Sequence, residues 1–68
     1  MPLNPAEELK LSEYFELNGI KPSRQERVRT IARMSSDEHS IKEIYAEVKG
    51  SMGDLIEHRS KLRRWGVW

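Results

Sequence analysis

The fold is decided by residues 40–56, which read Ser-Ile-Lys-Glu-Ile-Tyr-Ala-Glu-Val-Lys-Gly-Ser-Met-Gly-Asp-Leu-Ile. Ser40 and Glu43 have the Ser-x-x-Glu spacing of a capping box, in which each side chain accepts the backbone N–H of the other residue. Apolar residues then recur at the i, i+3, i+4 and i+7 positions of one helix face: Ile41, Ile44, Tyr45 and Val48. Because Gly50 can end this helix and Ser51 can cap another, the stretch predicts two short helices joined by a tight turn.

Two helices joined by a glycine turn are the plan of a helix-turn-helix, whose second helix can enter the major groove of DNA. Counted from position 42, the slots that need a small residue, a left-handed turn and an apolar anchor hold Ala46, Gly50 and Ile56. The match is partial, since Ser51 occupies a slot where an apolar residue usually faces the core. A simple helical bundle would produce the same local pattern.

The rest of the chain is also punctuated as helices. A first helix is expected from the cap at Asn4 to a left-handed stop at Gly19, and a last one from Ser51 to Gly66. Between them, a Ser-x-x-Glu box at Ser23 predicts a helix that ends at Ser35 and Ser36. In these three helices the residues expected to face the core are Leu11, Tyr14, Phe15, Val28, Ile31, Ala32, Met52, Leu55, Ile56 and Leu62.

The size of the chain limits what it can do. Its 68 residues, with no cysteine, allow one all-α domain over residues 1–68 and no disulfide or thiolate metal site. Two histidines, His39 and His58, have no metal-ligand spacing and are expected on the surface, so no metal or other cofactor is expected. No catalytic set, small-molecule site or membrane span is visible, which predicts a non-enzyme inside the cell, in the cytoplasm or nucleoid.

Charge is distributed in blocks along the chain. Summed over acidic and basic residues, segments 1–20, 21–34, 35–50 and 51–68 carry −3, +4, −2 and +2, which gives the net charge of +1. The two basic segments can form a common phosphate-binding surface, or they can pair with the acidic helices inside the fold. The sequence leaves both arrangements open.

Three motifs, at 19–28, 40–48 and 51–67, read Gly-Ile-Lys-Pro-Ser-Arg-Gln-Glu-Arg-Val, Ser-Ile-Lys-Glu-Ile-Tyr-Ala-Glu-Val and Ser-Met-Gly-Asp-Leu-Ile continuing to Leu-Arg-Arg-Trp-Gly-Val. Over about fifty residues they resemble the DNA-binding half of the ferric uptake regulator family. The resemblance implies a four-helix, winged-helix-like domain that binds duplex DNA, with a reduced or absent wing because the chain stops where the wing should begin. The family's metal-binding dimerisation domain is missing, so metal-dependent regulation is not implied.

The same resemblance makes residues 51–62 the recognition helix, with Asp54, Glu57, His58 and Lys61 on its outward side. Carboxylates aimed at a groove are repelled by phosphate, which argues for contacts to the DNA backbone more than to bases. The residues expected to contact DNA are Arg24, Arg27, Ser51, His58, Arg59, Lys61, Arg63 and Arg64. The expected role is regulatory or architectural.

An alternative function is docking on a protein partner through the C-terminal end of the chain. Trp65 is expected to fill the core, whereas Trp68 follows the helix stop and has less reason to be buried. An exposed tryptophan beside Arg63 and Arg64 has the composition of an interface hot spot. Because one small domain with few base contacts binds DNA weakly, we also expect it to act either as a homodimer or beside another DNA-bound protein.

Overall fold

The structure, a computed structural model, describes residues 3–68. It consists of α1 (Pro5–Leu17), α2 (Pro22–Ser36), α3 (Ile41–Val48) and α4 (Met52–Trp65). Residues 3–68 contain no strand, so the predicted all-α class with four short helices is confirmed for this part of the chain.

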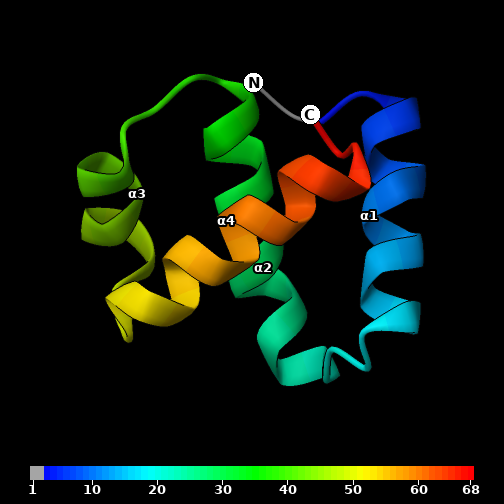
Figure 1. Cartoon of the computed structure of the whole chain (residues 1–68), viewed down its shortest axis with the longest axis horizontal. Helices are drawn as coiled ribbons and strands as arrows, with labels where there is room; N and C mark the ends of the chain where they lie inside the picture. Colours follow the sequence, from blue (N-terminus) through cyan, green and yellow to red (C-terminus); the bar gives the residue numbers. More distant parts are fainter. Residues whose placement is uncertain (1–2) are drawn as a thin grey trace.

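The four helices enclose one core. In Figure 1, α4 crosses in front of α2, while α1 and α3 lie on opposite sides of this crossed pair. Helices α2 and α4 each pack against all the other helices, whereas α1 and α3 are not in contact with each other. Helix α4 is therefore held from behind and from both sides, and its remaining side faces solvent.

Local capping chemistry sets most of the helix ends, as the sequence predicts. The Asn4 side chain accepts the N–H of Glu7 at 2.8 Å and the Glu7 carboxylate accepts the N–H of Asn4 at 2.9 Å, which closes the first capping box. Gly19 adopts a φ of +60°, and the N–H of Ile20 then donates to the carbonyl of Phe15 at 2.9 Å. This bond is the closure of a Schellman motif, so the predicted stop of α1 is confirmed.

The predicted caps of α3 and α4 are also present. Ser40 and Glu43 form the reciprocal box of α3, and the Ser51 hydroxyl accepts the N–H of Asp54 at the start of α4. Gly66 ends α4 with a φ of +90°. These ends depend on residues no more than a few positions apart, which is why the sequence alone predicts them.

The predicted start of α2 is wrong. The helix begins at Pro22 with Lys21 in the capping position, and no side chain caps it, so Ser23 lies inside the first turn. Proline has its φ already fixed near the helical value and lacks the N–H that the first helical position cannot use, so it takes that position. The loop is instead tied by Gln25, whose Nε2 donates to the carbonyl of Ile20 at 3.1 Å.

The buried core draws on every helix and on the residue that follows α4. Val67 lies beyond the helix stop and is 0% exposed, which the sequence analysis did not predict. Met34 and Ser35, at the end of α2, are also buried. The complete set of buried apolar residues is Leu11, Tyr14, Phe15, Val28, Ile31, Ala32, Met34, Ile44, Leu55, Leu62 and Val67.

Two residues of α4 that were predicted to face the core do not. Ile56 is 47% exposed and Met52 is 37% exposed. Leu55 and Leu62 are both fully buried, and because they lie seven residues apart they define the inward face of α4. Ile56 lies about 100° around the helix from Leu55 and so points to the side. Ala46, the small residue of the helix-turn-helix pattern, is also exposed. Neither Ala46 nor Ile56, the apolar anchor of that pattern, is therefore buried as predicted.

Candidate nucleic-acid interface

The short turn between α3 and α4 is held by one arginine of α2. Nη2 of Arg27 donates to the carbonyl of Lys49 at 2.8 Å and to that of Ser51 at 3.3 Å. Gly50, between these two residues, has a φ of +76°, and a Cβ built there would lie 3.3 Å from Arg27 Nη2. The turn therefore needs a glycine both for its left-handed backbone and for the close approach of the guanidinium.

The same arginine also fixes the first turn of α4. Nη1 of Arg27 donates to Oδ2 of Asp54 at 2.6 Å, and Nη2 of Arg24 reaches the same oxygen at 3.2 Å. The Arg27 and Asp54 side chains are largely buried, whereas Arg24 is more than half exposed. Two arginines expected to contact phosphate are thus bound to an acid within the fold.

A third arginine of α2, Arg29, is also paired internally. Its guanidinium bonds the carboxylate of Glu8 on α1 and lies 5.9 Å from the ring centroid of Phe15. The basic segment at 21–34 therefore serves largely to join α2 to its neighbours. Of the two arrangements that the sequence leaves open, internal pairing holds for Arg24, Arg27 and Arg29.

His58 faces the interior, contrary to the prediction of a surface histidine on the outward side of α4. Its Nδ1 lies 2.9 Å from the Tyr14 hydroxyl, and its Nε2 lies 3.4 Å from Oδ1 of Asp54. The position is three residues after Leu55 and four before Leu62, which places it on the inward face. Burial lowers the pKa of His58 and raises the pKa of Tyr14.

The outward side of α4 carries the remaining basic groups. Lys61 pairs with Glu57 at 2.8 Å, one turn earlier on the helix. Arg63 and Arg64 are exposed, and their guanidiniums form no ion pair or hydrogen bond with any residue in the range 3–68. Both belong to the last turn of the helix, where positive charge also interacts favourably with the helix dipole.

A shallow hollow lies beside this basic end. It is lined by Ile56, Arg59, Ser60, Arg63 and Trp68. The Nε of Arg59 is buried and has no hydrogen-bond partner within residues 3–68. Trp68 is half-buried and packs on the core, so the tryptophan after the helix stop is partly covered and partly available.

Trp65 has the surroundings of a partly buried core residue. Its ring meets that of Tyr14 edge to face, with the centroids 6.2 Å apart. The predicted packing of Trp65 against the core is confirmed, although the side chain is only half-buried.

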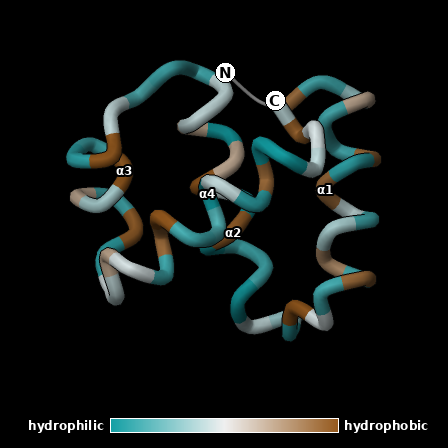
Figure 2. The backbone as a smooth tube through the Cα atoms, in the orientation of Figure 1, coloured by the Kyte–Doolittle hydropathy of each residue, from teal (hydrophilic) through white to brown (hydrophobic). Residues whose placement is uncertain are grey.

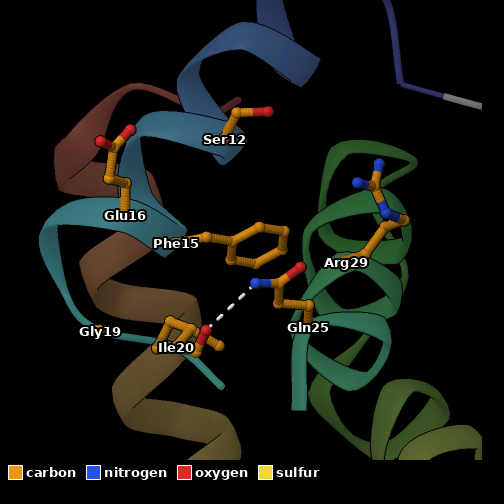
Figure 3. A pocket seen from close by; sticks show the side chains of 7 residues that line it. All are labelled: Ser12, Phe15, Glu16, Gly19, Ile20, Gln25 and Arg29. Atoms are coloured by element: carbon orange, nitrogen blue, oxygen red, sulfur yellow. Dashed lines mark hydrogen bonds between the residues drawn. The ribbon is translucent and has the colours of Figure 1, made fainter. Parts of the chain in front are cut away.

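A second hollow, between α1 and α2, is larger, and two of its polar side chains, Gln25 and Arg29, are engaged within the fold. Figure 3 shows Phe15 and Ile20 in it, with Gln25 bonded to the Ile20 carbonyl. The Arg29 guanidinium on its rim is the one already paired with Glu8. The amide and the guanidinium that line this hollow therefore already have partners within the fold.

Residues 3–68 contain no group of three or more metal-ligating side chains that could hold a metal ion. None of the four helices in this range has the length and apolar composition needed to cross a membrane. Comparison with protein-family models, with curated proteins and with solved structures gives no match. The resemblance to the ferric uptake regulator family therefore stays a prediction.

Proposed function

We propose that this domain binds duplex DNA through phosphate contacts from the C-terminal half of α4, in a regulatory or architectural role. In this proposal α3, the turn and α4 act as a helix-turn-helix, with the exposed side of α4 toward the DNA. The observation that carries it is the position of Arg63 and Arg64, which are exposed on the outward side of α4 and unpaired within residues 3–68.

The free cations distinguish this part of the surface from the other arginines. A guanidinium that already binds a carboxylate has part of its charge offset and some of its donors used, whereas the guanidiniums of Arg63 and Arg64 have no such partner. Together with Arg59, they give three candidate phosphate contacts. Three contacts predict a slope of log binding constant against log salt of about −2.7.

In this proposal α4 makes few contacts that distinguish one base sequence from another. Among the exposed side chains of the first two turns of α4 are Met52, Ile56 and Glu57. The two apolar residues can contact a thymine methyl group, but the carboxylate is repelled by the phosphates that flank the groove. We therefore expect weak binding that depends on salt more than on base sequence.

The test is a fluorescence anisotropy titration of a labelled duplex of about 20 base pairs at several salt concentrations. Arg63→Ala and Arg64→Ala should each weaken binding and reduce the slope by about 0.9. The matched control is Lys10→Ala, which removes one exposed charge from α1 and should leave the slope unchanged. Circular dichroism checks that each variant is folded.

Two results would contradict the proposal. One is the absence of binding by the wild-type protein at about 20 mM salt, where phosphate contacts are strongest. The other is a slope that does not change in Arg63→Ala and Arg64→Ala, because the proposal assigns both residues to phosphate. Either result would show that the C-terminal half of α4 does not bind DNA phosphates.

A further inference from the structure

The outer side of α1 has apolar groups that no part of the fold covers. Leu9 is 64% exposed and Leu17 is 69% exposed. Figure 2 shows hydrophobic residues on the outer as well as the inner side of this helix. Leu9, Glu13, Glu16 and Leu17 lie at helical spacings of three and four residues, which places them on one stripe. We name these four residues the acidic leucine face.

The charges on this stripe are free. Glu13 and Glu16 are exposed, and their carboxylates form no ion pair or hydrogen bond with another residue in the range 3–68. This separates them from Glu7 and Glu8 at the start of the same helix, which are engaged in a capping box and in the pair with Arg29. A complementary surface must therefore offer positive charge beside apolar area.

The hollow beside the end of α4 has that composition. It is lined by Ile56, Arg59, Ser60, Arg63 and Trp68, which we name the basic hollow. Its two guanidiniums have no carboxylate partner among residues 3–68, and the Nε of Arg59 is buried without a hydrogen bond. The Ile56 and Trp68 side chains supply apolar surface next to these cations.

We propose that two copies of this chain associate, with the acidic leucine face of one copy seated on the basic hollow of the other. Leucine then meets Ile56 and Trp68, while Glu13 and Glu16 approach Arg59 and Arg63. The outer side of α1 points away from the core, so a second copy, and not the same molecule, supplies the complementary surface.

The contact is small, which sets its expected strength. A 13-residue helix is about 20 Å long, so the buried area falls below the roughly 1,200 Å² of a stable interface. We expect a weak association that appears at protein concentrations of about 0.1 mM and above and declines with added salt. The two surfaces differ, so the contact is heterologous.

Sedimentation velocity with charge-reversal variants tests the contact. Glu13→Lys combined with Glu16→Lys should weaken self-association at least about tenfold, and so should Arg59→Glu combined with Arg63→Glu, because like charges then face each other. An equimolar mixture of the two variants should associate again, since each restores the opposite charge to the other. Arg63→Glu alone is a second variant that avoids the partly buried Arg59.

The controls reverse exposed charges elsewhere. Glu26→Lys on α2 and Lys42→Glu on α3 should change the association by less than about twofold, because neither residue belongs to the two surfaces. A wild-type chain that stays monomeric at about 1 mM overturns the inference. So does a mixture of the two reversed variants that fails to associate.

A variant of α1 separates this inference from the proposed DNA contact. Leu17→Ser should weaken self-association and leave the salt slope of DNA binding unchanged, because Leu17 lies outside the α4 surface. If the wild-type chain self-associates but does not bind the duplex, only the proposed function is overturned. Self-association that is unaffected by Leu17→Ser would overturn the inference alone.

Discussion

Asp54→Ala should destabilise the domain more than any other single change to an acidic residue, because Asp54 joins α4 to two arginines of α2. Its carboxylate binds Arg27 at 2.6 Å and Arg24 at 3.2 Å, and it lies 3.4 Å from His58. It also stands in the first turn of α4, where a negative charge interacts favourably with the helix dipole. The substitution removes all four interactions and keeps the backbone N–H that Ser51 caps.

The magnitude follows from the exposure of each partner. The Arg24 pair is more than half exposed and contributes little, as exposed pairs do. The Arg27 pair is largely buried, so losing its charged hydrogen bond costs about 1–2 kcal/mol, and the helix dipole adds about 0.5 kcal/mol. The total is about 2 kcal/mol, which corresponds to a fall in Tm of roughly 8–16 °C for a domain of this size.

Urea unfolding followed by circular dichroism at 222 nm measures this change. Glu57→Ala is the control, since it also removes a carboxylate from α4 but one that pairs only with exposed Lys61, and its unfolding midpoint should stay close to that of the wild type. If Asp54→Ala costs no more than Glu57→Ala, the arginine pairs do not hold α2 to α4. The assignment of Arg24 and Arg27 to internal pairing would then be wrong.

Three further changes test the fold. Val67→Ala removes two methyl groups from a fully buried side chain and should cost about 2 kcal/mol in the free energy of unfolding measured in urea. Gly50→Ala should lower the Tm more than Gly19→Ala, because both force alanine into a left-handed backbone but only Gly50 has a guanidinium 3.3 Å from the added Cβ. Burial lowers the pKa of His58, so the unfolded chain takes up this proton first as the pH falls below about 6.5. Stability should therefore drop between about pH 7 and pH 5, and the drop in the urea midpoint should be smaller in His58→Gln.

The sequence predicts the helix ends well, because capping is local. Asn4, Ser40 and Ser51 each bind a backbone N–H three residues away, and nothing elsewhere in the fold is needed to form these bonds. The exception is α2, where a Ser-x-x-Glu motif competes with a proline one position earlier. The fixed φ of Pro22 decides the start, so Ser23 lies two positions past the capping residue Lys21 and does not cap the helix.

Which side chains of α4 point into the core is harder to predict than the presence of the helix. Leu55 and Ile56 are adjacent and equally apolar, and the sequence does not say which of them points inward. Leu55 is buried because it shares a face of α4 with Leu62. The same rotation of the helix directs His58 toward Tyr14 on α1, 44 positions earlier in the chain. Burial of Val67 likewise depends on contacts made only after the four helices have packed.

The fate of the arginines shows why a charge pattern does not by itself define a binding surface. Asp54 stands in the first turn of α4, and the packing of α2 against α4 brings the arginines at the start of α2 next to it. The Asp54 carboxylate therefore offsets part of the charge of both arginines. At the other end of α4 no acid from residues 3–68 reaches Arg63 or Arg64, so the same kind of side chain keeps its full charge for a partner. Whether an arginine pairs within the fold is thus set by the carboxylates that helix packing brings next to it.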